Sequence, residues 1–433
     1  MSPDLLLALL FIGILLALYI IGVPVAFAMG LTCLLLMFSP LISFEPQLIM
    51  HQMVTSLDNF IILAVPLFLM TGLYMNMFGM TTSIFDFSEA LVGSIRGGIA
   101  HVNVVASVIF SGMSGAAQAD AAGLGVIEFN AMKERGYDEG YSVAVTGSSS
   151  IIGPIIPPSI PVIFYGIMAE ESIGALFIAG VVPGLILASV LLLMCTYYAH
   201  KKGFERGESW SINRILETFK RAAPALGAPI LIIGGIMLGL FTATEAGAVA
   251  LFYTLLIGFV FYDSPSLKEF LQVSYEGFVT TAALLFIITA AFLYSFMVRR
   301  AQIPHVLSDF VTGITTNPLP TLLLLVAILL IIGLMMETIA AITILVPVLL
   351  PIIHSAGIDP IHFGIIMILT LMIGLLTPPF GIILFILQKV TGVPLSEIMR
   401  SILPFYFPLV GVLILLILFP EITLSLPRLS GLV

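Results

Sequence analysis

The chain has 433 residues, of which 60% are hydrophobic and 9% are charged, and its formal net charge is −9. Soluble proteins carry about 25% charged residues, so this composition excludes an ordinary soluble domain and predicts an all-α, polytopic protein of the lipid bilayer. Two isolated cysteines and six scattered histidines form no disulfide framework and no metal-ligand spacing. The sequence also lacks a GxxxxGKS/T phosphate loop, so ATP is not expected to drive the protein directly. We expect no organic cofactor and no nucleic-acid partner.

Five spans and one broken apolar run are predicted in the first half, residues 1–210. The spans lie at about 4–21, 23–40, 60–80, 140–167 and 173–199. The broken run, at about 99–131, contains the polar, glycine-rich stretch Ser111–Asp120, which leaves two arms of about a dozen residues each. Because a spanning helix needs about 20 apolar residues, this run predicts a re-entrant helical hairpin. A polar connection is expected at 81–98.

The second half, residues 211–433, repeats this plan. Its spans are predicted at about 222–241, 244–262, 276–298, 360–387 and 402–425, and a second hairpin at about 318–352 has its tip near Gly333–Ala340. Three motif pairs are each separated by 221 residues: Gly112 and Gly333, Gly153 and Gly374, and Pro157-Pro158 and Pro378-Pro379. A constant offset through different motifs indicates an internal repeat. Five spans per half are an odd number, so the halves must insert with opposite orientation, as inverted repeats.

The basic residues predict the orientation of these repeats. If the hydrophilic segment 200–221 is cytoplasmic, as its six Lys and Arg residues suggest, twelve of the fifteen basic residues lie on that side. The other three, Arg299, Arg300 and Arg428, then lie outside. Both termini are predicted to be outside, with the first hairpin open toward the cytoplasm and the second toward the exterior.

Proline and glycine interrupt one span in each half, beside the hairpin. Gly153-Pro154 with Pro157-Pro158, and Gly374 with Pro378-Pro379, should unwind their helices, because proline supplies no N–H and clashes with the preceding turn. Irregular backbone at membrane depth must line a protein-walled or watery site. Freed carbonyls with Ser and Thr hydroxyls suit Na⁺, and half-helix N-termini suit an anion. The pattern predicts a secondary-transporter site near the midplane; the alternative is that the prolines only kink helices and the glycines let them pack.

The candidate residues lie at these breaks and at the hairpin tips. A first Na⁺ site is expected at Gly112, Ser114, Ser148, Ser149 and Gly153, and a second at Glu337, Thr338, Gly374 and Thr377. The anionic substrate is expected at Ser114, Gln118, Asp120, Ser150, Pro157, Pro158, Pro378 and Pro379. An ionisable residue inside the membrane is a functional candidate by default. A structural hydrogen bond is an equal alternative for Asp120 and Glu337, and the preferred one for Glu245.

The segment Gly112-Met-Ser-Gly115 also matches the GxSG of rhomboid-type intramembrane serine proteases. Such a serine needs a histidine base. His101, His354 and His362 lie at the edges of apolar runs, without a comparable motif of small residues. The repeated architecture has no role in a protease, so we expect no enzyme activity.

Five segments carry a resemblance to a known family: Gly22–Gly30, Ser111–Asp120, Gly153–Ser159, Phe241–Ala248 and Leu376–Gly381. They resemble the large membrane subunit of tripartite ATP-independent periplasmic (TRAP) transporters, the DctM-like family, nearly from end to end. The resemblance implies an importer of a small organic anion, such as sialic acid or a C4-dicarboxylate, driven by at least two Na⁺ ions across a bacterial inner membrane. It also implies two partners, a periplasmic substrate-binding protein and a separate small membrane subunit of about four spans.

By the same resemblance the protein is expected to work as an elevator. The hairpins with spans 140–199 and 360–425 would move against a scaffold of spans 1–80 and 222–298. Arg299 and Arg300 are an exposed basic pair that is expected either to dock the binding protein or to reach lipid phosphates. A stand-alone anion/sodium symporter, which takes its substrate directly from solution, is the alternative function.

Overall fold

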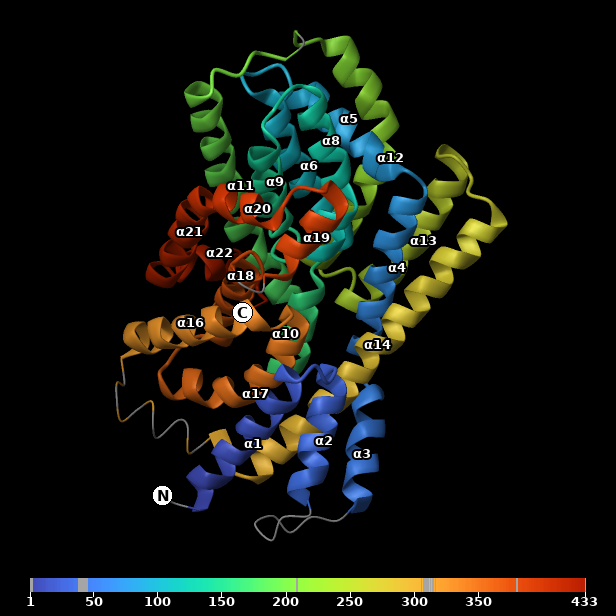
Figure 1. The fold of residues 1–433 in the computed structure, drawn as a ribbon. Coiled ribbons are helices and arrows are strands. Elements are labelled where there is room, and N and C mark those ends of the chain that lie inside the picture. The colour runs from blue at the N-terminus through green and yellow to red at the C-terminus, as the bar shows by residue number, and fades with distance from the viewer. Residues whose placement is uncertain are drawn as a thin grey trace.

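The computed structural model describes residues 3–37, 46–207, 209–304, 306, 311, 313, 315, 317–378 and 381–432. In this part of the chain every regular element is a helix, apart from an isolated backbone bridge between Arg96 and Arg206 (Figure 1). Eight of the described helical stretches are long and apolar enough to cross a membrane, and six shorter apolar helices accompany them. The prediction of an all-α polytopic membrane protein is confirmed.

The first half contains both the predicted hairpin and the predicted broken span. Its helices are α1 (Pro3–Ile20), α2 (Val25–Met37), α3 (Pro46–Leu57), η1 (Phe60–Leu63), α4 (Ala64–Met77), α5 (Met80–Val92), α6 (Gly98–Ser114), α7 (Ala117–Ala122), α8 (Leu124–Glu134), α9 (Glu139–Ser150), α10 (Ile160–Ala169) and α11 (Ile173–Lys201). The hairpin is α6 with α7 and α8, and the break lies between α9 and α10. The α6 arm has 17 residues, longer than the expected dozen.

The second half contains the equivalent elements. Its helices are α12 (Ile212–Met237), α13 (Ala243–Phe261), α14 (Leu267–Arg300), α16 (Pro318–Met335), α17 (Thr338–Ser355), α18 (Pro360–Leu375), α19 (Ile382–Thr391), α20 (Leu395–Ile402), η2 (Leu403–Phe405), α21 (Tyr406–Leu418) and α22 (Glu421–Leu429). The hairpin is α16 with α17, and the break lies between α18 and α19.

Helix boundaries in the two halves keep the offset that the motifs predicted. The starts of α3 and α14, of α7 and α17, and of α9 and α18 are each 221 residues apart, as are the ends of α8 and α17. Some of the capping residues recur as well: Asp138 and Asp359 are the N-caps of α9 and α18. These four spacings are the ones that the predicted internal repeat would give, while the starts of α6 and α16 and of α10 and α19 are offset by one residue more or less.

Three predicted boundaries are wrong. The segment 81–98 is not a connection: its first part is α5, which packs along α6 and α12 through buried residues such as Ile84 and Phe85 while Asp86 and Glu89 supply polar groups. Helix α12 begins at Ile212, ten residues before the expected span, because its first turns are amphipathic rather than apolar. The expected span 402–425 is divided into α21 and α22 at Pro420.

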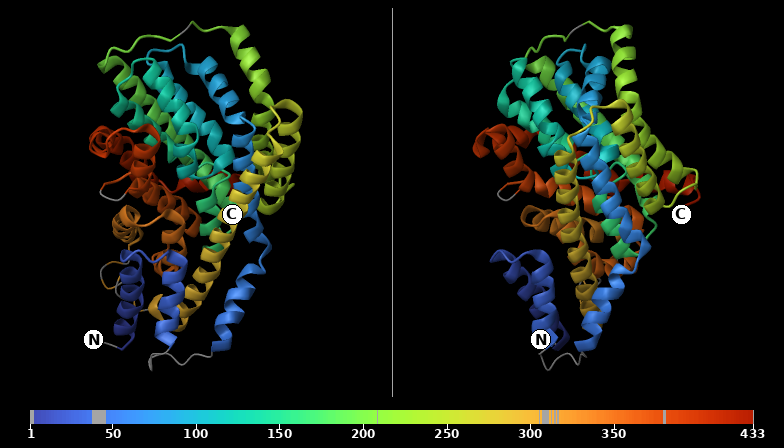
Figure 2. Two further views of the ribbon diagram at one scale, coloured as in Figure 1. Left: turned by 45° about the vertical axis from the view of Figure 1, so that its right-hand side comes forward. Right: turned by 90° about the vertical axis from the view of Figure 1, so that its right-hand side faces the viewer.

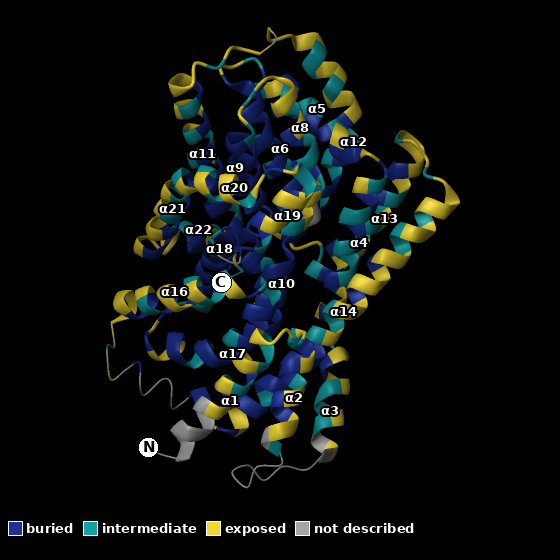
Figure 3. Ribbon diagram, viewed as in Figure 1, coloured by how far each residue is buried: buried dark blue, intermediate teal, exposed yellow. Residues whose placement is uncertain are grey.

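The most buried helices are the broken spans. All residues from Gly140 to Ser150 of α9, from Ile160 to Ala169 of α10 and from Ile361 to Leu375 of α18 are buried, as the dark blue ribbon shows (Figure 3). By contrast, α12, α13 and α14 expose large apolar side chains, among them Ile230, Phe252, Leu256 and Phe278. The interrupted helices therefore form the centre, and continuous helices form an apolar exterior.

Helix α14 connects distant parts of this exterior. It has 34 residues and runs along one side of the molecule (Figure 2). The ring of Phe270, near its start, stacks on Tyr74 of α4, while Tyr294, near its end, lies 5.0 Å from the ring of Phe11 in α1. This single helix thus contacts α1, α2, α3 and α4. The hairpins and broken spans occupy the centre.

Candidate functional site

The first hairpin tip lies against the break between α9 and α10. Gly115 has a φ of +59°, and a Cβ placed on it would lie 2.4 Å from the carbonyl oxygen of Pro158, so glycine alone allows this approach. The N–H of Ile160 donates to the carbonyl oxygen of Gly115 over 3.2 Å. The hydroxyl of Ser159 accepts from the N–H of Val162 and so caps α10. The tip and the unwound segment are joined backbone to backbone.

The second hairpin approaches its broken span just as closely. A Cβ placed on Gly374 would lie 2.5 Å from the carbonyl carbon of Gly333, so α16 and α18 touch through backbone at this point. Beyond Gly374, the N–H of Thr377 donates to its carbonyl oxygen over 2.9 Å. The hydroxyl of Tyr406 donates to the carbonyl oxygen of Leu376 over 2.6 Å. Tyr406 thereby satisfies one acceptor that the end of α18 leaves open.

The two hairpin tips meet each other at the centre. Nε2 of Gln118, on α7, donates to Oε1 of Glu337 over 3.4 Å. The other carboxylate oxygen of Glu337 accepts from the N–H groups of Ile339 and Ala340, at 2.8 and 3.2 Å, and caps α17. In addition, α7 packs against α19 and α10 packs against α17. Each hairpin therefore contacts the broken span of the opposite half.

Two hydroxyls of the expected Na⁺ sites are buried without a hydrogen-bond partner in the described part of the chain, those of Ser148 and Thr338. Buried polar atoms are normally hydrogen-bonded, so these oxygens are candidate ligands for an ion. The hydroxyls of Ser149, Ser150 and Thr377 donate to the side-chain oxygen of Asn103 and to the carbonyl oxygens of Gly147 and Ile373, at 2.7, 2.9 and 2.7 Å. A donating hydroxyl still offers lone pairs to a cation.

The remaining expected residues lie around these contacts. Gly112 faces the ring of Pro229 on α12, where an added Cβ would lie 2.8 Å from the proline Cβ, and Gly153 faces Ala116 at the tip. Pro157 and Pro158 are buried and Pro378 is half-buried. Asp120 is buried on α7, and its two carboxylate oxygens have no hydrogen-bond partner among the described residues. Pro379 lies outside the described residues, as does the side chain of Ser114.

Three expected polar or charged groups lie away from the centre. Glu245 forms a capping box with Thr242 at the start of α13, where its carboxylate accepts from the Thr242 N–H over 2.8 Å. This agrees with the structural role preferred for Glu245. The hydrogen bond caps α13 and does not reach a hairpin. Arg299 and Arg300 end α14 and are exposed.

Sequence reasoning missed Asn103, which organises the neighbourhood of Ser149. Its Nδ2 donates to the hydroxyl of Thr146 over 2.8 Å, while its Oδ1 accepts from Ser149. This bridge joins α6 of the hairpin to α9 of the broken span. The available signal was a single amide in an otherwise apolar hairpin arm, because polar groups inside a membrane usually bond across helices. Tyr406 gave no such signal, since one tyrosine in an apolar span is common.

Among the described histidines, His101 shares α6 with Ser114 but is not placed to act as its base. Ser114 and His101 lie thirteen residues apart on this helix, which corresponds to about 20 Å at the rise of an α-helix. His101 is engaged elsewhere: its Nε2 lies 2.9 Å from the hydroxyl of Thr196, and its Nδ1 lies 3.1 Å from the carbonyl oxygen of Gly97. The rhomboid alternative is therefore not supported at this serine.

Comparison with known proteins places the chain in a family. The family described as "Tripartite ATP-independent periplasmic transporter, DctM component" matches residues 12–422. The sialic acid TRAP transporter large permease protein SiaM of Vibrio cholerae is 42% identical over 411 residues, covering 94% of this chain and 95% of that protein. The C4-dicarboxylate TRAP transporter large permease protein DctM of Pseudomonas aeruginosa is 37% identical, covering 86% and 88%.

A solved structure shares the fold. The crystal structure of the YdaH transporter of Alcanivorax borkumensis superimposes with a TM-score of 0.64, covering 91% of this chain and 98% of that one, at 14% sequence identity. At this identity the likeness concerns the fold alone. The match to the family profile and the identities of 42% and 37% decide the assignment: the chain belongs to the DctM component family of TRAP transporters, as a large permease subunit and not an enzyme.

Proposed function

We propose that the protein imports a small organic anion by coupling its entry to at least two Na⁺ ions. The observation that carries this proposal is the meeting of the two hairpin tips at Gln118 and Glu337, with a broken span behind each tip. Oxygen-rich breaks in both halves supply two cation sites, and helix ends between them supply partial positive charge for an anion. Each Na⁺ that enters contributes about 2.3 kcal/mol per 100 mV of membrane potential.

The first proposed Na⁺ site lies where the first tip meets the α9–α10 break. Its ligands are drawn from Gly112, Ser114, Ser148, Ser149 and Gly153, and the unpaired hydroxyl of Ser148 supports this choice. The second lies where α16 meets the α18–α19 break, with ligands drawn from Glu337, Thr338, Gly374 and Thr377. The unpaired hydroxyl of Thr338 and the contact of Gly333 with Gly374 support it.

The substrate is proposed to bind between these sites. Gln118 is half-buried where the two tips meet, and Pro158 touches the first tip, so both are well placed to contact the substrate. The other proposed substrate contacts are Ser114, Asp120, Ser150, Pro157, Pro378 and Pro379. A carboxylate such as that of sialic acid or a C4-dicarboxylate is the proposed ligand class. The names of the relatives from Vibrio cholerae and Pseudomonas aeruginosa motivate these two examples.

The proposed mechanism is an elevator built from two inverted repeats, residues 1–210 and 211–433. The recurrence of helix boundaries at a 221-residue offset supports the repeats. The crossed contacts of α7 with α19 and of α10 with α17 support a single mobile unit that contains both hairpins. The scaffold would be α1–α4 and α12–α14, whose exposed apolar side chains suit lipid or a small membrane subunit of about four spans.

The proposed location is a bacterial inner membrane with both termini periplasmic. The loop between α11 and α12 and the basic residues Arg96, Arg135 and Arg214 gather at one end of the molecule, which suits a cytoplasmic end. Arg299 and Arg300 are the last two residues of α14. The C-terminal end of this helix lies toward the lower end of the molecule in Figure 1, and a periplasmic binding protein is proposed to dock there.

Reconstituted vesicles test the function directly. Purified protein with a candidate small subunit is placed in vesicles, a binding protein loaded with labelled anion is added outside, and an inward Na⁺ gradient is applied. Uptake should require both Na⁺ and the binding protein. Uptake of free anion without a binding protein would instead establish the stand-alone symporter, and uptake that is indifferent to Na⁺ would refute the coupling.

A further inference from the structure

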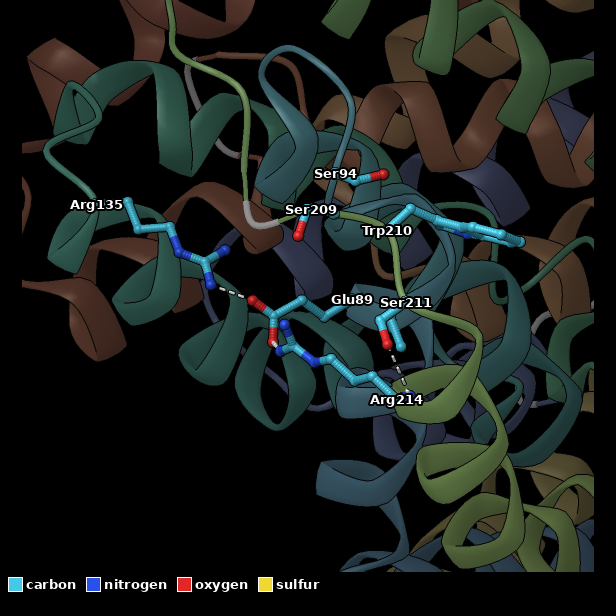
Figure 4. Close-up of a pocket in the computed structure, with 9 residues that line it drawn as sticks. Glu89, Ser94, Arg135, Ser209, Trp210, Ser211 and Arg214 are labelled. Atoms are coloured by element: carbon cyan, nitrogen blue, oxygen red, sulfur yellow. Dashed lines mark hydrogen bonds and ion pairs between the residues drawn. The ribbon is translucent and has the colours of Figure 1, made fainter.

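Glu89 on α5 connects three elements at the end of the molecule that carries the α11–α12 loop (Figure 4). Its side chain is 13% exposed and both of its carboxylate oxygens are engaged: Oε1 pairs with Nη2 of Arg135, and Oε2 lies 3.0 Å from Nη2 of Arg214. Arg135 directly follows α8, the last helix of the first hairpin, and Arg214 lies in the first turn of α12. One carboxylate therefore joins the hairpin, α5 and α12.

The same end carries both connections between the proposed scaffold and the proposed mobile unit in the first half. Helix α5 leads from α4 to α6, and the segment 202–211 leads from α11 to α12. The two connections are bonded to each other, since the N–H of Gly97 donates to the carbonyl oxygen of Glu205 over 3.1 Å and Nε of Arg96 donates to that of Phe204 over 2.9 Å. If the hairpin moves past α12, the contacts at this junction must change.

The pairs of Glu89 differ from the pair of Arg221 with Glu217 on α12. Arg221 and Glu217 lie 2.8 Å apart on a single helix, with side chains 68% and 67% exposed, so their pair is screened by water and lies within α12. Glu89 is mostly enclosed, and its charge-assisted hydrogen bonds cross from one element to another. Because α5 packs along both α6 and α12, separating the hairpin from α12 must open one of these two pairs.

We infer that Glu89 is a positioning residue of the transport cycle: it holds the first hairpin to α12 in this conformation and releases it when the hairpin moves. The inference rests on the proposed function, in which the hairpin belongs to the mobile unit. Loss of either pair should favour the conformation in which the hairpin has left α12. A fixed link across the junction should stop transport.

A reversible cross-link tests the required separation. In a background without Cys33 and Cys195, Arg135→Cys is combined with Arg214→Cys and treated with a short bifunctional thiol reagent that dithiothreitol removes. Uptake should fall to background when the link forms and return after reduction. Matched cross-linking of Glu217→Cys with Arg221→Cys, both on α12, should leave uptake unchanged. Complete cross-linking of positions 135 and 214 with normal uptake would overturn the inference.

Neutral variants test the role of the carboxylate itself. Spin labels at Glu134→Cys and Lys220→Cys, which are exposed on the hairpin end and on α12, report the distance across the junction without any need for uptake. Glu89→Gln and Arg135→Gln should raise the ratio of the longer to the shorter distance about threefold, whereas Arg221→Gln should match the parent. Equal distance distributions in Glu89→Gln and the parent would overturn the inference, while an uptake that is indifferent to Na⁺ would refute only the proposed coupling.

Discussion

Nε2 of Gln118 and Oε1 of Glu337 lie 3.4 Å apart and form a contact between the two hairpin tips. The two residues are 219 positions apart in the sequence and belong to opposite halves of the proposed repeat. Since Glu337 also caps α17, the hydrogen bond from Gln118 reaches the carboxyl group that begins the second arm of the other hairpin. A substitution of Gln118 is therefore expected to affect both proposed Na⁺ sites.

Replacement of Gln118 by leucine should lower Na⁺-driven uptake about tenfold, because it removes the hydrogen bond between the two tips. The fold should stay intact, because Gln118 is only half-buried. Initial uptake rates and the melting temperature in detergent measure the two effects. Gln272→Leu is the matched control, since Gln272 donates to Glu276 over 3.0 Å within one exposed helix. Equal uptake by the two variants would remove the tip contact from the mechanism.

Thr377→Val should raise the Na⁺ concentration for half-maximal uptake about fivefold, the effect of losing one ligand of about 1 kcal/mol. The change keeps the shape of the side chain and removes its hydroxyl. Thr370→Val provides the control, because Thr370 makes the same bond to the carbonyl four residues earlier, to Ile366, but lies within α18 and away from the break. An unaltered Na⁺ dependence in Thr377→Val would exclude this hydroxyl as a ligand.

Gly374→Ala should destabilise the protein by about 1–3 kcal/mol, the usual cost of an overpacked core, and abolish uptake. The added Cβ would lie 2.5 Å from the carbonyl carbon of Gly333, and backbone atoms cannot yield as a flexible side chain does. Thermal unfolding in detergent measures the loss. Gly411→Ala on α21 meets no atom within 4 Å and should behave like the parent, so similar melting temperatures for both variants would contradict the close approach.

Cysteine labelling can test the proposed orientation of the protein in the membrane. Ser209→Cys, in the exposed α11–α12 loop and a background without Cys33 and Cys195, should react with an impermeant maleimide only in inside-out vesicles. Glu170→Cys, in the exposed turn between α10 and α11, should react only in intact right-side-out cells. Reaction of Ser209→Cys from outside would reverse the proposed topology.

Arg299→Glu combined with Arg300→Glu should weaken uptake at limiting binding protein and recover partly when its concentration is raised, because a charged rim mainly changes association. The lysine pair at the same positions keeps the charge and should transport normally. Wild-type uptake should also fall as ionic strength rises at constant Na⁺. Normal uptake by the glutamate pair at limiting binding protein would leave lipid contact as the role of these arginines.

The breaks were predictable from sequence because glycine and proline act locally. The pairs Gly153-Pro154 and Pro157-Pro158 follow the end of α9, and Gly374 and Pro378 lie at the end of α18. A lone proline is a weaker signal, since Pro183 and Pro229 lie inside α11 and α12. Helix α5 was not predictable from hydropathy, since Asp86 and Glu89 interrupt the apolar pattern and their partners come from α12 and the hairpin end. The hydrogen bonds of Asn103 and Tyr406 depend on which distant helices pack beside them. That packing cannot be read from a single sequence.

The crossed packing of the halves also constrains how the chain is made. Helix α7 is complete once residue 122 has been synthesised, but its partner α19 begins at residue 382. At synthesis rates of roughly 5–20 residues per second, α7 waits on the order of 10 to 50 s for its contact with α19. The other contacts of α7 form earlier, because it packs on α6, α8 and α9 and the carbonyl oxygen of Gly115 accepts from the N–H of Ile160. The first half can therefore assemble around its tip before the second half arrives.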